Sequence, residues 1–253
     1  MSPAPTPDHD ALLDAIRPVL DVVDPTRGAC AAVLGEFVGL ISAAPVGPDD
    51  LVTIVTDATR HGEVPIGPLA YAPGDPQFAV SDDGRSAWAY TEREPGVTNV
   101  IGTLHIEPGS VVVGGSRYGW IPDAGCVPSH VLLADLESVL AEQRVYLHRR
   151  AAQIGYLGRV RVTVHVHCEV PGRPLVLRRL DEVTGELLPG GEPVAHFTPI
   201  VTDYPLTASI EQTRRIYYGI AGRIAEQFGA PAPQFLADPD TDICDDVPVG
   251  PAA

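Results

Sequence analysis

The chain has 253 residues, of which 45% are hydrophobic and 20% are charged, and its formal net charge is −16. This hydrophobic content excludes a disordered protein, and a chain of this length can bury one large core or two modest ones. No apolar run approaches the ~18 residues that a membrane-spanning helix needs. The N-terminus has no basic stretch followed by an apolar core, so we expect no signal peptide and a cytoplasmic protein without a membrane partner.

The basic residues exclude several kinds of chemistry, because all 17 of them are arginine. Without lysine, the protein cannot hold pyridoxal phosphate as a lysine Schiff base or bind a nucleotide through a P-loop. Eleven of the arginines lie between residues 144 and 223, whereas the rest of the chain is acidic. The molecule as a whole lacks the positive field that attracts nucleic acid. We therefore expect a protein partner or a small anionic ligand that contacts the basic segment locally.

The N-terminal part is predicted to be helical. Residues 1–9 carry three prolines and predict a flexible tail, and residues 10–62 form a helical segment. Apolar residues recur at helical spacing in three stretches, namely 10–23, 28–43 and 49–60. Pro18 should kink or shorten the first helix, whereas Pro48 suits the start of the third. These helices would form a small layer.

Residues 63–128 are predicted to form an antiparallel β meander. Two hairpins are expected, one from strands at 77–80 and 86–91 and the other from strands at 97–106 and 110–114. Gly84 and Gly109 supply turn residues between the paired strands. The density of proline and glycine favours this arrangement over a parallel sheet.

Residues 129–230 are predicted to form an α-β-α unit with a basic face. A long helix over 130–154 would begin at Ser129 as its N-cap. A strand over 159–170 follows, in which valines alternate with polar residues, so that one face is buried and the other is open.

The rest of this unit contains more strands and a last helix. Strands are predicted at 174–179 and 193–201, and a helix at 210–228 that starts with a capping box and stops at Gly229. Residues 231–253 are expected to be a disordered acidic tail. This order of elements predicts an α+β fold in which helices cover one face of an antiparallel sheet.

The polar face of the 159–170 strand is the main candidate site. It presents Arg159, Arg161, His165 and His167. Arginine binds carboxylate or phosphate in a forked geometry, and neighbouring histidines would make this capture depend on pH. Arg117 and Trp120 in a glycine-rich loop are further candidates, through charge and ring stacking. These residues suggest a non-catalytic binding or regulatory protein that captures an anionic ligand or an acidic protein segment.

His165 and His167 also support a second hypothesis, a metal-dependent enzyme. Residues i and i+2 of a strand lie ~6.5–7 Å apart, so both histidines can hold one divalent ion, with His196 or Glu169 completing the set. The four cysteines contain no CxxC pair, so a cysteine-rich zinc site is not expected. A third hypothesis is a self-associating accessory subunit, and therefore a homo-oligomer. A solvated strand face without a ligand is the alternative to all three.

Overall fold

The computed structural model describes residues 8–23, 28–60, 77–94, 97–116, 128–181 and 183–240. The helices are α1 (His9–Val23), α2 (Pro48–Arg60), α3 (Leu133–Gln153) and α4 (Ile210–Gln227). The strands are β1 (Cys30–Val38), β2 (Gln77–Val80), β3 (Ser86–Glu94), β4 (Val97–Glu107), β5 (Ser110–Ser116), β6 (His130–Leu132), β7 (Arg159–His167), β8 (Val176–Leu180), β9 (Leu187–Pro189) and β10 (Ile200–Pro205).

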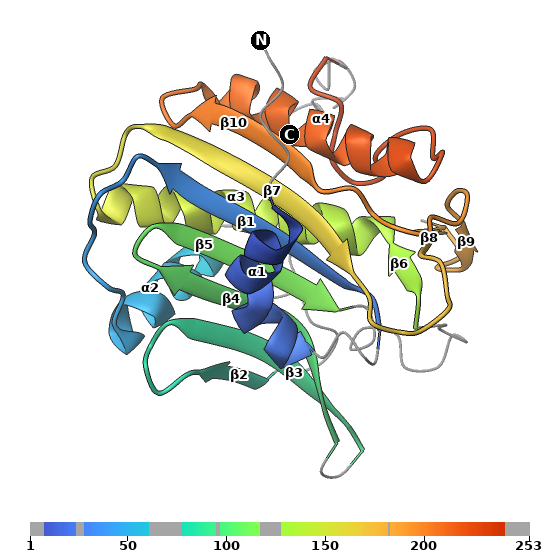
Figure 1. Ribbon diagram of the computed structural model, residues 1–253, viewed down its shortest axis with the longest axis horizontal. Coiled ribbons are helices and arrows are strands. Elements are labelled where there is room, and N and C mark those ends of the chain that lie inside the picture. The colour runs from blue at the N-terminus through green and yellow to red at the C-terminus, as the bar shows by residue number, and fades with distance from the viewer. Residues whose placement is uncertain are drawn as a thin grey trace, which may run out of the picture.

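A seven-stranded antiparallel sheet forms the centre of the molecule (Figure 1). Its strand order is β10-β7-β1-β5-β4-β3-β2. A second sheet contains β6, β8 and β9, and within it β6 and β8 run parallel. The four described helices and the mostly antiparallel strands confirm the α+β class.

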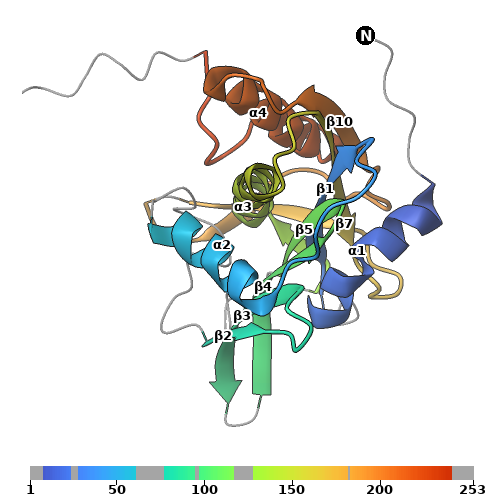
Figure 2. The ribbon, with the colours of Figure 1, turned by 90° about the vertical axis from the view of Figure 1, so that its left-hand side faces the viewer.

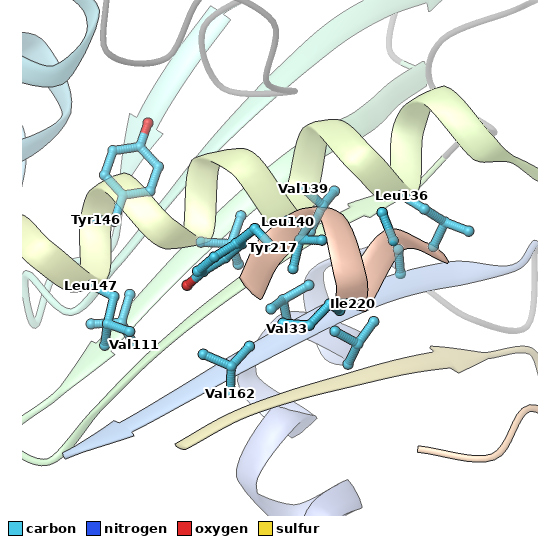
Figure 3. Packing of buried hydrophobic residues seen from close by; sticks show 14 of the residues in the cluster. Val33, Val111, Leu136, Val139, Leu140, Tyr146, Leu147, Val162, Tyr217 and Ile220 are labelled. Atoms are coloured by element: carbon cyan, nitrogen blue, oxygen red, sulfur yellow. The ribbon is translucent and has the colours of Figure 1, made fainter. Parts of the chain in front are cut away.

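Helices cover both faces of the large sheet rather than one (Figure 2). The larger core joins the sheet to α2, α3 and α4, and it contains Val33, Val162, Leu140 and Ile220 (Figure 3). A smaller core lies under α1 on the opposite face. The expectation of one covered face was wrong, because α1 belongs to the other side of the sheet.

Close packing of α1 on the sheet depends on a glycine. Gly114 of β5 has no side chain, and an added Cβ would overlap the side chain of Val19 in α1. The helix continues through Pro18 to Val23, although the proline was expected to kink or shorten it. α1 therefore lies directly against the strand backbone at this point.

β1 is a strand, although the apolar spacing predicted a helix over residues 28–43. It lies between β5 and β7 and is buried continuously from Cys30 to Gly35. A strand that is covered on both faces contains apolar residues at nearly every position and shows no polar alternation. Periodicity alone cannot distinguish such a run from a buried helix.

Several local predictions are confirmed. Both predicted hairpins form, and Gly84 has a φ of 69° in the first turn. α4 begins with the predicted capping box of Ser209 and Gln212. α3 starts later than predicted, because residues 130–132 pair with β8 as a strand, and Ser129 is therefore not its N-cap.

The C-terminal segment is held against the molecule through residue 240, which corrects the expectation of disorder from 231 onward. Glu137 of α3 is fully buried, and its carboxylate accepts backbone N–H groups of residues 234, 235 and 236 at 2.6, 2.6 and 2.7 Å. Asp240 accepts two hydrogen bonds from Arg215 of α4. Residues 241–253 lie outside the described part.

Candidate functional site

The polar residues of β7 share one face of the strand but not one surface. The valines at even positions are buried in the larger core, as predicted. Four sequence-predicted site residues project from the opposite face, namely Arg159, Arg161, His165 and His167. At about 3.3 Å per residue, the first and last of these lie roughly 26 Å apart. Thr163 and His165 are buried, so this face is not open along its length as expected, and the arginine end and the histidine end are separate.

The arginine end is occupied by carboxylates of the same chain. Arg161 lies in register with Glu36 of β1 and Asp203 of β10. Its Nε and one terminal nitrogen donate to the two Asp203 oxygens at 2.9 and 3.2 Å. The hydrogen bond to Asp203 raises the pKa of Arg161, whereas burial raises the pKa of Glu36. One guanidinium therefore lies between two acids, and this end of the strand is not a basic surface.

Other arginines of the basic segment also contact their own chain. Besides Arg161, four of them donate hydrogen bonds within the molecule: Arg150 to Ala44 and Gln153, Arg178 to Leu187, Arg215 to Asp240, and Arg223 to Val201 and Thr202. Much of the positive charge that the sequence concentrates here is therefore used in intramolecular contacts.

The histidine end contains a buried imidazole without a hydrogen-bond partner. His165 is only 4% exposed, and neither of its ring nitrogens has a partner among the described residues. Its ring centroid lies 5.8 Å from that of His167 and 5.8 Å from that of His9. Burial, assisted by these two histidines, lowers the pKa of His165 to about 4. At neutral pH the ring is uncharged, and one of its nitrogens carries a free electron pair.

His167 is oriented by an acidic neighbour. Its Nε2 lies 3.2 Å from an oxygen of Glu169, and its side chain is mostly buried. A carboxylate that accepts the Nε2 proton leaves the Nδ1 electron pair available. Cys30 of β1 lies in register with His167, and burial raises the pKa of its thiol far above the ordinary value.

His9 was not predicted from the sequence as a site residue, and other predicted site residues do not join this cluster. His9 begins α1, and its ring reaches His165 only because that helix crosses the sheet. His196, expected as a third ligand, is exposed in the segment before β10, whereas the next residue, Phe197, packs near His165. Arg117 and Trp120 lie outside the described residues. No three His, Cys, Asp or Glu side chains within the described ranges are already grouped to hold a metal ion.

A separate cavity of about 440 Å³ lies at the end of α3, away from the histidines. It is lined by residues 42–45 of the loop after β1, together with Asp50, Arg150, Gln153 and Ile154. Arg150 is buried there, but its terminal nitrogens already donate to Ala44 and Gln153. The negative Asp50 on the same wall opposes an anionic ligand.

Comparison of the chain with protein-family models, with curated proteins and with solved structures finds no match. None of the helices in the described ranges has the length and apolar character needed to cross a membrane. We therefore infer the function from the chemistry of the residues that the fold brings together.

Proposed function

We propose that this protein binds a divalent transition-metal ion through His165 and His167, beside the start of α1. The observation that carries the proposal is the buried, unpartnered imidazole of His165 next to a second imidazole. A buried polar group without a partner costs about 1–3 kcal/mol of stability. A metal ion would give one of the two ring nitrogens a bonding partner.

The separation of the two rings suits a shared ion. Two imidazoles on one tetrahedral zinc ion have ring centroids roughly 5–6 Å apart, because each ligating nitrogen lies about 2 Å from the metal. The centroids of His165 and His167 are 5.8 Å apart. Changes in side-chain torsion, without movement of the strand, would bring both nitrogens to the same ion.

The surroundings of both histidines favour metal binding at neutral pH. Protons compete with metal ions for imidazole nitrogen. This competition is weak at His165, whose pKa burial lowers to about 4. Glu169 holds His167 in the way that carboxylates hold metal-bound histidines in proteins, by accepting the proton of the other ring nitrogen.

His9 is the third ligand of the proposed site. It is exposed at the first turn of α1, so its side chain can rotate toward the ion. A zinc ion with three protein ligands keeps a position for water, which is the composition of catalytic zinc sites rather than closed structural ones. This extends the proposal to a metal-dependent enzyme.

Capture of an anionic ligand by the whole strand face has less support. Asp203 already takes both forked donors of Arg161, and the arginines and the histidines lie at opposite ends of β7. Metal binding requires only His165 and His167, which lie together at one end of the strand.

The test is metal binding by single histidine variants. Isothermal titration with Zn²⁺ and with Ni²⁺, together with elemental analysis of the purified protein, should give one ion per chain. His165→Gln and His167→Gln should each weaken binding by 10-fold or more, whereas His196→Gln, which changes an exposed histidine outside the cluster, should not. His167 is partly exposed, so its variant remains informative if His165→Gln fails to fold. Equal binding by wild type and by the His165→Gln/His167→Gln double variant would overturn the proposal.

A further inference from the structure

A second polar cluster lies at the other half of the sheet, in the β3–β4 hairpin. Ser86 begins β3 and pairs in register with His105 of β4, while Glu107 ends β4 on the same face. These residues are separate from the proposed metal site on β7. They were not singled out by the sequence, because only the register of the hairpin places Ser86 opposite His105.

The three side chains form a continuous hydrogen-bonded chain. Ser86 Oγ lies 2.7 Å from His105 Nδ1, and His105 Nε2 lies 3.1 Å from a Glu107 oxygen. Arg85 donates from one terminal nitrogen to both Glu107 oxygens, at 3.1 and 3.2 Å. His105 is 7% exposed, so packing limits rotation of its ring. The imidazole of His105 is therefore held by packing and by hydrogen bonds at both of its ring nitrogens.

The acidic neighbour of His105 assigns the chemical roles. An ionised carboxylate only accepts, so Nε2 of His105 must carry the proton that faces Glu107. Nδ1 of the neutral ring is then an acceptor, and the hydroxyl of Ser86 donates to it. A hydroxyl paired with a base, which is in turn oriented by an acid, is the arrangement that activates serine as a nucleophile.

We propose that Ser86, His105 and Glu107 hydrolyse small activated carboxylic esters through an acyl-serine intermediate. Ser86 Oγ attacks the ester carbonyl, and its proton moves to Nδ1 of His105. The bond to the leaving alkoxide or phenoxide breaks, and that group takes the proton from His105. Water then attacks the acyl-serine with His105 again as the base, which releases the carboxylic acid and restores Ser86. Glu107 stabilises the imidazolium formed in both steps.

The limited oxyanion stabilisation at this site restricts the substrate class. The backbone N–H of Ser86 donates to Ser81 Oγ at 2.9 Å, and that of Ile106 donates to the carbonyl of residue 85. These groups are therefore engaged within the hairpin, and the side chain of Arg85 is the nearby cation. Weak stabilisation of the oxyanion favours esters with good leaving groups, such as phenyl acetates.

The experiment is hydrolysis of p-nitrophenyl acetate by the full-length chain in EDTA, which separates this activity from the proposed metal site. Wild type should release p-nitrophenolate faster than buffer and carry one acetyl group on Ser86 by peptide mass spectrometry. Ser86→Ala and His105→Gln should each lower the rate roughly 10²-fold. Ser138→Ala, which removes a hydroxyl that donates to the carbonyl of Ala134 in its own helix, should leave the rate unchanged.

One further variant keeps the result independent of folding. Glu107→Gln retains the size of the side chain and should lower the rate while the thermal midpoint stays close to that of wild type. Acetylation at residues other than Ser86, or an unchanged rate in a folded Ser86→Ala protein, would overturn the proposal.

Discussion

Arg161 of β7 and Asp203 of β10 lie directly opposite each other and share two parallel hydrogen bonds, at 2.9 and 3.2 Å. The side chain of Arg161 is 35% exposed and that of Asp203 is 18% exposed. The pair therefore links the edge strand to its neighbour while remaining in contact with solvent. A partly exposed ion pair of this kind contributes modestly to stability and is screened by salt.

Replacing Asp203 by asparagine should therefore have a small effect. We expect Asp203→Asn to lower the free energy of unfolding by about 0.5–1 kcal/mol, and the difference should shrink as salt is added. Urea unfolding at low and high salt measures both quantities. Arg159→Gln, at an exposed position on the same strand, is the control and should change stability by less than about 0.5 kcal/mol. A loss of several kcal/mol for Asp203→Asn would mean that the pair is shielded from solvent.

The buried His165 should make stability depend on pH in the acid range. Its pKa is lowered from 6.5 in the unfolded chain to about 4 in the fold, mainly by burial. The unfolded chain therefore binds a proton first, so stability is complete above pH 6.5 and is lost as the pH falls toward 4. The free energy of unfolding falls by about 3 kcal/mol in total over this pH range.

His165→Phe tests this linkage against wild type. It removes the titrating group and the two unpartnered nitrogens, so the variant should be at least as stable as wild type at pH 7. The difference between the two proteins, measured by urea unfolding at steps between pH 7 and 4.5, should grow in favour of the variant. His9 and His167 face the same ring and stay present in both proteins. Parallel pH curves for the two would show that His165 titrates normally.

The valine face of β7 should not tolerate a charge. Val164 is completely buried in the larger core, so Val164→Asp places an unpaired carboxylate there at a cost of several kcal/mol. Because domains are stable by only about 5–15 kcal/mol, we expect this variant to be unfolded or insoluble. Val183→Asp, at a position that is 93% exposed, is the matched control and should fold. Circular dichroism distinguishes the outcomes.

The C-terminal segment should be needed as far as Asp240. A chain that ends at Ala230 lacks the three backbone donors of Glu137 and the packing of Leu236 against the larger core. We expect a loss of about 3 kcal/mol or more. A chain that ends after Asp240 keeps these contacts and should unfold at nearly the wild-type urea concentration. Equal stability of the two truncated chains would contradict the role assigned to Glu137.

Local signals in the sequence predicted much of this fold. The alternating valines of β7 predicted which face of the strand is buried. Ser209 and Gln212 predicted the start of α4, and Gly84 predicted a hairpin turn. Each of these signals is read within a few neighbouring residues. β1 was misassigned because a central strand and a buried helix share the same apolar composition.

The candidate sites were harder to predict because they depend on contacts between distant segments. His165 and His167 are two residues apart, so their proximity was visible in the sequence. His9 reaches them only through the path of α1, and Asp203 meets Arg161 only through the pairing of β10 with β7. The same limit applies to Glu137, whose donors lie near the C-terminus.

The contact of Val19 with Gly114 makes the docking of α1 a step that can be altered on its own. A methyl group at position 114 would overlap the side chain of Val19 and push the helix away from β5. Since His9 lies on that helix, an ion held by His165, His167 and His9 would bind the docked state more tightly than the undocked state and stabilise it by mass action. Zinc should then slow amide hydrogen exchange in residues 9–23 of the wild type, and Gly114→Ala should abolish that protection. The first helix would thus be a locally unfolding unit whose opening is controlled by metal concentration.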